Sequence, residues 1–233
     1  MYTIRPSDAR GKADHGWLKS RFTFSFADYR DPAHMGYTNL RVLNDDWIAP
    51  GQGFGMHPHR DMEIFSFVDV GQLQHRDSQG NERVIHPGRV QLMGAGSGIQ
   101  HSEFNPSADE RTHLYQIWVL PRARGLEPSY AELDYDLADP HNTLKRLADP
   151  HGTDGALPIR QHICIYTSDL DAGEALDLPL AGSAWLQLMR GSISIGGQTL
   201  SAGDGLAIQD EPDVRAEATE DAAFLYFDMA AKP

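Results

Sequence analysis

The sequence predicts an all-β protein made of two small β-barrels, and three observations lead to this prediction. Short strand-like runs such as LRVLNDDWI (40–48) and MEIFSFVDV (62–70) alternate with glycine-rich breaks such as PGQGFG (50–55), a spacing typical of sandwiches and barrels. No stretch before Pro121 has the period of an amphipathic helix. A strand, turn, glycine and strand also follow one another in the same order twice along the chain.

The repeat indicates that one barrel was duplicated. GQLQ (71–74) aligns with GSIS (191–194), and PGRVQLM (87–93) aligns with AGDGLAI (202–208). The second copy has a shorter turn and lacks any His-x-His sequence. We therefore expect an N-terminal barrel with a metal site in residues 1–132 and a C-terminal barrel without a metal-ligand motif in residues 133–233.

The segment between the two copies, 121–158, is rich in Pro, Asp and Gly. Its PSYAELDYDL part (128–137) is expected to hold a helical turn, and ADPHGTDGALP (148–158) is expected to be loop. Near the N-terminus, RFTFSFADY (21–29) is expected to place Phe22, Phe24 and Phe26 on one face of a strand. These rings are expected to fill the barrel core, with an aromatic substrate pocket as the alternative role for one of them.

Composition limits the function classes. The 233 residues include 22 Gly and 14 Pro with 40% hydrophobic residues, as in a globular, turn-rich protein. A net charge of -13 argues against direct nucleic-acid binding, which needs a basic face. The single cysteine, Cys164, excludes an intramolecular disulfide. No secretory signal is visible in residues 1–16 and no apolar run approaches membrane-spanning length, so we expect a cytoplasmic protein.

Two short clusters carry the candidate chemistry. In GQGFGMHPHRDMEIFSFVDVG (51–71), His57 and His59 are two residues apart, as are His101 and Glu103 in the HSE sequence. Residues two apart on a strand point to the same face, so two such pairs on facing strands would form a four-ligand metal site. The proline between the two histidines suits an edge strand.

These residues carry a family resemblance. Gly51, His57, His59, Glu63 and Gly71 resemble the first cupin motif, with one extra residue before the last glycine. Seven segments in order resemble the pirin family, and within it the bacterial pirin-like quercetin dioxygenases: HGWL (15–18), FTFSFADY (22–29), DP..MGY (31–37), RVLNDD (41–46), GFGMHPHRDMEI (53–64), HSEFNPS (101–107) and HLYQIW (113–118). The resemblance implies a bicupin, two jelly-roll barrels in one chain, and it implies that the first strands cross to pack on the second barrel.

The resemblance leaves two carboxylates as the fourth ligand. Ordinary cupins use the position of Glu63, which alternation also places on the face of His57 and His59, whereas pirins use the position of Glu103. Because the chain has both DMEI and HSEFN, we favour Glu103 as ligand and as general base, and expect Glu63 to orient an imidazole as a hydrogen-bond acceptor. The other histidines are expected to be structural: His15, His34, His75, His86, His113, His141, His151 and His162.

Three imidazoles and one carboxylate form a ligand set without thiolate that suits one divalent transition metal. We expect iron(II), whose octahedron would leave two positions open, with copper, manganese, nickel, cobalt or zinc as alternatives. The resemblance implies a dioxygenase that opens the heterocycle of flavonols such as quercetin, releases carbon monoxide and uses dioxygen. Two alternatives remain: a metal-dependent, redox-sensitive co-regulator that docks on a protein partner, and a cupin with an unrelated small-molecule reaction.

Overall fold

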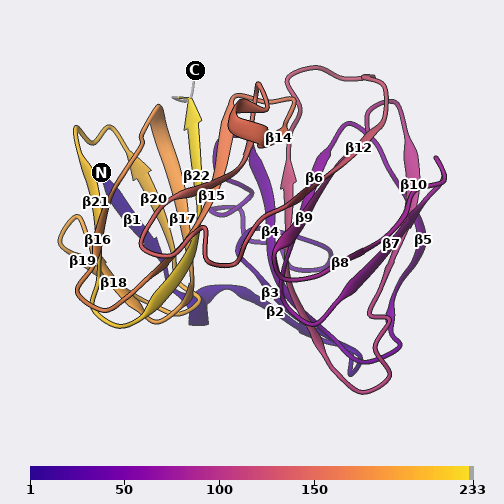
Figure 1. The fold of residues 1–233 in the computed structure, drawn as a ribbon, viewed down its shortest axis with the longest axis horizontal. Coiled ribbons are helices and arrows are strands. Elements are labelled where there is room, and N and C mark those ends of the chain that lie inside the picture. Colours follow the sequence, from indigo (N-terminus) through magenta and orange to yellow (C-terminus); the bar gives the residue numbers. More distant parts are fainter. Residues whose placement is uncertain (231–233) are drawn as a thin grey trace. The chain divides into compact units, whose positions relative to one another are not determined.

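The computed structural model describes residues 1–230, which are almost entirely β-strand and form two compact units (Figure 1). The N-terminal unit comprises residues 11–135, and the C-terminal unit comprises residues 1–10 together with the chain from Asp136 onward. Each unit contains one seven-stranded and one four-stranded sheet. The predicted all-β bicupin class is confirmed. No helix within the described residues is long and apolar enough to cross a membrane.

In the N-terminal unit the seven-stranded sheet has the order β12-β9-β6-β11-β4-β3-β2 and the four-stranded sheet the order β5-β10-β7-β8. The strands of the larger sheet are β2 (Gly11–Asp14), β3 (Leu18–Phe22), β4 (Leu40–Ile48), β6 (Glu63–Val70), β9 (Arg89–Gly94), β11 (Thr112–Val119) and β12 (Ser129–Asp134). Those of the smaller sheet are β5 (Gly53–His59), β7 (Leu73–Asp77), β8 (Glu82–Ile85) and β10 (Ile99–Phe104). All these pairs are antiparallel.

The C-terminal unit repeats this arrangement, with orders β1-β20-β17-β22-β15-β13-β14 and β16-β21-β18-β19. The larger sheet contains β1 (Tyr2–Arg5), β13 (Lys145–Asp149), β14 (Leu157–Pro158), β15 (Ile163–Leu170), β17 (Gly182–Arg190), β20 (Gly205–Gln209) and β22 (Ala222–Ala230). The smaller sheet contains β16 (Ala175–Leu178), β18 (Ser192–Ile195), β19 (Gln198–Ser201) and β21 (Val214–Ala218). Two short 3-10 helices, Ser7–Ala9 and Thr153–Gly155, complete this unit.

The duplication predicted from the repeat is visible in the sheet orders. The aligned segments fall on matching strands, β7 with β18 and β9 with β20. The interiors differ, however. The buried positions of β10 are Ile99, His101 and Glu103, whereas β21 buries only Val214, Ala216 and Ala218. The latter three belong to a continuous apolar core that fills the C-terminal unit.

The expected helical turn at 128–137 is wrong, because Ser129–Asp134 is strand β12, paired residue by residue with β9. Sheet pairing therefore outweighs the weak helical preference of this segment. A boundary after Glu132 would cut this strand; the compact unit extends to Tyr135 instead. The chain start departs from a division at residue 132 but agrees with what the resemblance implied, because β1 pairs with β20 and joins residues 1–10 to the C-terminal unit.

The expected row of three phenylalanines on one strand face is also wrong. Strand β3 ends at Phe22, so strand alternation does not continue to Phe24 and Phe26. Phe22 and Phe24 are both buried, and Phe22 and Phe26 line a cavity. Phe22 and Phe26 therefore fit the alternative role, an aromatic wall of a cavity, and Phe24 fits core packing.

Candidate metal centre

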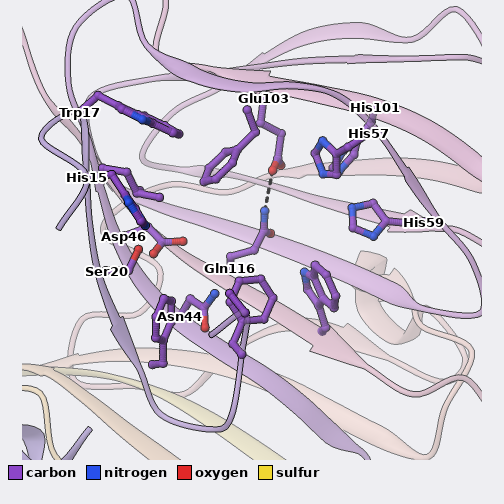
Figure 2. Close-up of a pocket in the computed structure, with 16 residues that line it drawn as sticks. His15, Trp17, Ser20, Asn44, Asp46, His57, His59, His101, Glu103 and Gln116 are labelled. Carbon is purple, nitrogen blue, oxygen red and sulfur yellow. Dashed lines mark hydrogen bonds between the residues drawn. The ribbon is translucent and has the colours of Figure 1, made fainter. Parts of the chain in front are cut away.

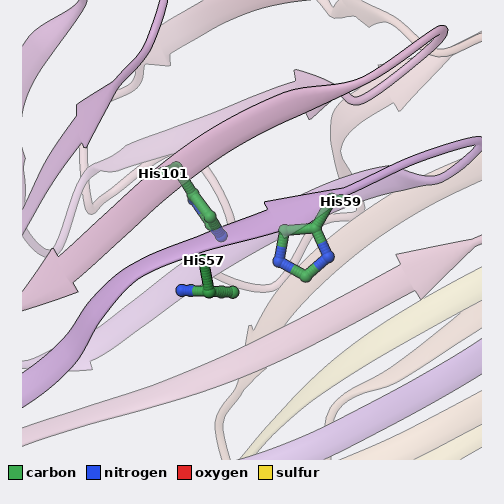
Figure 3. A group of neighbouring side chains, drawn as sticks. All are labelled: His57, His59 and His101. Carbon is green, nitrogen blue, oxygen red and sulfur yellow. The ribbon is translucent and has the colours of Figure 1, made fainter.

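Strand β5 presents His57 and His59 from the edge of the four-stranded sheet. Within the described residues, β5 pairs in this sheet with β10 alone. The register places His57 opposite His101 and Pro58 opposite Gln100. A proline is tolerated there because an edge strand has one unpaired side, as the sequence predicted. The register brings a third imidazole beside the first two, and the three rings lie close together next to these strands (Figure 3).

Gly53 allows β5 to lie this close to β10. A Cβ atom at this position would lie 2.2 Å from the carbonyl oxygen of Glu103, which is well inside van der Waals contact. The register of the two strands shifts between His101 and Glu103, directly beside this glycine. The glycine-rich run before the histidines thus fixes the strand spacing on which the cluster depends.

The three imidazoles are arranged as metal ligands would be. The ring centroids lie 4.7 Å apart for His57 and His59, 4.5 Å for His57 and His101, and 4.8 Å for His59 and His101. One nitrogen from each ring lies within 4.8 Å of the others. The Nε2 atoms of His59 and His101 are buried without a hydrogen-bond partner, a costly state that a bound cation would relieve. These residues therefore fit a metal ion.

The protonation states agree with this fit. Burial, reinforced by repulsion from His101 and His57, lowers the pKa of His59 to about 4. Burial, reinforced by His57 and His75, lowers the pKa of His101 to about 3. Both rings are therefore neutral at neutral pH, which is the state that binds metals. The Nδ1 of His57 lies 2.7 Å from the carbonyl oxygen of Gly55; donation there leaves its Nε2 lone pair for a ligand.

Glu103 lies on the same strand as His101, two residues further on, and is 2% exposed. It groups with His75 and His101 in a second cluster of potential ligands rather than with the three clustered imidazoles. Its Oε2 accepts a 2.7 Å hydrogen bond from Gln116 Nε2, drawn as a dashed line in Figure 2. Gln91 Nε2 lies 3.4 Å from Oε1. Amide donors on the opposite sheet thus hold this carboxylate inside the unit.

His75 was expected to be structural, but it is fully buried in contact with the cluster. Its Nδ1 lies 3.4 Å from His101 Nδ1, and its Nε2 lies 3.3 Å from Asp77 Oδ2. Burial would raise the pKa of Asp77, but hydrogen bonds from Asn81, His75 and Gln79 keep it below its ordinary value. Asp77 therefore accepts from His75 Nε2–H. His75 in turn accepts from Nδ1–H of His101, which leaves the buried Nε2 of His101 unprotonated.

Strand alternation could have revealed this chain of contacts. His75 and Asp77 are two apart on β7, and the register places them opposite Glu103 and His101 of β10.

Glu63, the other candidate carboxylate, is buried on β6 of the larger sheet and belongs to neither ligand cluster. Among the described residues, Glu103 is therefore the carboxylate that lies with potential histidine ligands.

A cavity of about 470 Å³ opens on the imidazoles (Figure 2). This volume is within the range of small-molecule sites. Its walls are mainly aromatic, and Trp118 packs edge-on against His59 with ring centroids 4.8 Å apart. The lining residues are His15, Trp17, Leu18, Ser20, Phe22, Phe26, Ala27, Asn44, Asp46, Phe54, His57, His59, His101, Glu103, Gln116 and Trp118.

His113 has a different role. It stacks on Trp47 with ring centroids 4.2 Å apart and lies between two carboxylates, 2.8 Å from Asp45 and 3.0 Å from Asp69. Burial would lower its pKa, but hydrogen bonds to the two aspartates outweigh burial and raise it to about 9. His113 is thus a buried cation, consistent with the structural role expected for it.

Comparison with known proteins gives an independent result. A family model described as Pirin matches residues 3–119, and one described as a quercetinase C-terminal cupin domain matches residues 147–229. A quercetin 2,3-dioxygenase of Escherichia coli K12 is 42% identical over 98% of this chain and 99% of its own, and a pirin-like protein of Caulobacter vibrioides is 41% identical over 99% and 100%. The crystal structure of the E. coli pirin YhhW with nickel(II) has a TM-score of 0.94 at 41% identity and covers 99% of this chain and 100% of that one.

Proposed function

The chain belongs to the pirin family, and we propose that it is a metal-dependent dioxygenase that opens the heterocycle of flavonols such as quercetin and releases carbon monoxide. One observation carries this proposal: buried, unpartnered imidazole nitrogens of His59 and His101 face an aromatic-lined cavity large enough for a small ligand. The E. coli relative named quercetin 2,3-dioxygenase supports it, and the nickel(II) complex of the E. coli pirin YhhW supports the metal dependence.

We propose His57, His59, His101 and Glu103 as the ligands of one divalent ion, with iron(II) as the native metal. The set contains only nitrogen and oxygen donors. When bound, the ion would supply Lewis acidity toward the flavonol and dioxygen. The protein supplies the rest, because the aromatic side chains that line the cavity bind the flat rings.

We propose that Glu103 accepts the proton of the flavonol 3-hydroxyl; its buried carboxylate, which lines the cavity, supports this role. Gln116 and Gln91 donate hydrogen bonds to it and hold its position before and after proton transfer. Replacing Glu103 by Gln keeps the size of the side chain but removes the basic oxygen. We expect this variant to remain folded and to lose turnover by roughly 100-fold or more; unchanged turnover would remove Glu103 from the mechanism.

The test of the proposal uses protein loaded anaerobically with iron(II), with metal content, oxygen uptake, carbon monoxide and flavonol absorbance measured. We expect stoichiometric metal and turnover in the wild type, and loss of both in His59→Ala. The matched control is His162→Ala, an exposed histidine in the C-terminal unit, which should behave as the wild type. If metal binds but neither oxygen nor quercetin is consumed, the dioxygenase proposal fails and the co-regulator alternative becomes the better explanation of the metal site.

A further inference from the structure

The cavity has a second polar end, across from the imidazoles. Strand β4 of the larger sheet directs Asn44 and Asp46 to one face, because they are two residues apart. Figure 2 shows both side chains on the side of the cavity opposite His57, His59 and His101, with Glu103 and Gln116 between the two groups. A ligand that touches the imidazoles at one end could therefore reach Asn44 and Asp46 with the other.

These two side chains have unsatisfied hydrogen-bonding atoms. Asn44 is 2% exposed and Asp46 is 4% exposed, and the Oδ1 atom of each lacks a hydrogen-bond partner. Buried polar groups are nearly always hydrogen-bonded in proteins, so two such atoms at one end of a cavity indicate a ligand that provides the missing partners. The neighbouring wall contains the apolar Leu18, Phe22 and Phe26, together with the polar side chains of His15 and Ser20. Polar recognition at this end thus involves only a few side chains.

The charge state of Asp46 fits a hydroxyl partner. Burial is the main cause that raises its pKa to about 7, with further contributions from Asp45 and Glu103, while a hydrogen bond with Ser20 and the charge of His113 act in the opposite direction. At neutral pH a carboxyl with this pKa carries its proton in about half of the molecules, and the protonated form can both donate and accept. A phenolic hydroxyl also does both, and it matches such a carboxyl better than a carboxylate or an amine would.

We propose that Asn44 and Asp46 form a hydroxyl-recognition site that selects among flavonols by the hydroxyl groups on the rings remote from the metal. This inference rests on the proposed function, because it takes the flavonol as the occupant of the cavity. It assigns the remote end of the substrate to these two residues, while the imidazoles and Glu103 act at the reacting end. Asn44 and Asp46 are therefore binding residues that set specificity.

The test compares flavonols that differ only in remote hydroxyl groups. Affinities of metal-loaded protein are measured without oxygen, by quenching of tryptophan fluorescence, for 3-hydroxyflavone, its 5,7-dihydroxy derivative and quercetin. Trp17 and Trp118 line the cavity and provide the signal. We expect the wild type to prefer quercetin over 3-hydroxyflavone. In Asp46→Leu and in Asn44→Leu, we expect this affinity ratio to fall by roughly 3- to 30-fold, the usual effect of losing one or two hydrogen bonds.

Two further variants separate recognition from packing. Asp46→Asn keeps a donor and an acceptor, and it should retain most of the preference for quercetin. Phe26→Leu removes part of the aromatic wall, and it should weaken all three flavonols by a similar factor without changing the ratio. Circular dichroism and thermal unfolding check that each variant is folded.

The outcomes distinguish the two proposals. If the wild type binds none of the flavonols, the proposed function fails and this inference fails with it. If the wild type binds quercetin no more tightly than 3-hydroxyflavone, or if the Asp46→Leu and Asn44→Leu variants keep the wild-type ratio, the flavonol proposal survives but the recognition site is refuted. That second result would mean that trapped water satisfies Asn44 and Asp46.

Discussion

Asp46 should lower the stability of the metal-free protein at neutral pH, and Asp46→Asn should remove this effect. Burial is the main cause that raises the pKa of Asp46 from 3.8 to about 7. At about 1.4 kcal/mol for each pKa unit, this corresponds to about 4 kcal/mol. The direction follows from proton linkage: above pH 3.8 the unfolded chain releases the proton while the folded chain keeps it, so stability falls as pH rises toward 7.

Between pH 5 and pH 8 the effect amounts to about 2 to 3 kcal/mol, because part of the loss already occurs below pH 5. We therefore expect Asp46→Asn to gain this much stability relative to wild type over that interval. The assay is urea unfolding at both pH values, followed by tryptophan fluorescence. Three of the 4 tryptophans, Trp17, Trp47 and Trp118, belong to the N-terminal unit and report on it.

The control is Asp28→Asn, an exposed carboxylate in the same unit, which should change stability by less than about 0.5 kcal/mol at either pH. If the stability difference between wild type and Asp46→Asn is the same at pH 5 and pH 8, the carboxyl does not keep its proton in the folded state. The proposal that Asp46 recognises a ligand hydroxyl through its protonated carboxyl would then lose its chemical basis.

Three further predictions concern residues outside the cavity's remote end. His75→Phe should weaken metal binding by roughly 10- to 100-fold, measured by competition with a chelator, because it removes the acceptor that orients His101; unchanged affinity would refute the orienting role. The pKa of His113 is raised to about 9, so its charge should stabilise the fold fully below pH 6.5 and lose this effect as pH rises through 9. The free energy of unfolding of the wild type, measured relative to His113→Gln by urea unfolding, should therefore fall by up to about 3 kcal/mol between pH 6 and pH 10. Gly53→Ala should displace β5 from Glu103 and reduce metal content in the purified protein, whereas Gly55→Ala, which meets no atom within 4 Å, should not.

Much of the fold follows from local sequence patterns, because strands and turns are local features. Alternation places His57 beside His59 and His101 beside Glu103, and the internal repeat predicts the duplicated sheet order. The exceptions involve pairing between distant segments. β12 is a strand because β9 offers a free edge, and the first residues join the C-terminal unit because β20 does the same. Neither partner is visible in the local sequence.

The clustering of the three histidines was predictable, but the residues that support them were less so. The two pairs carry a spacing signal, and the structure brings His57, His59 and His101 together. His75 has the same spacing from Asp77, yet its importance depends on the register between β7 and β10, which no single segment specifies. Glu103 as the fourth ligand remains a prediction, because the structure groups it with His75 and His101 instead of with all three clustered imidazoles.

The neighbouring aspartates of β4 illustrate why a residue's type does not determine its role. Asp45 and Asp46 are adjacent in sequence and point to opposite faces of one strand. Asp45 pairs with the cationic His113 at 2.8 Å, so the charge of His113 compensates for the burial of the Asp45 carboxylate. Asp46 has Ser20 as its partner and an unpaired oxygen at the cavity wall, so burial favours its neutral form. The first arrangement stabilises the fold, whereas the second costs stability unless a ligand supplies the missing hydrogen bond.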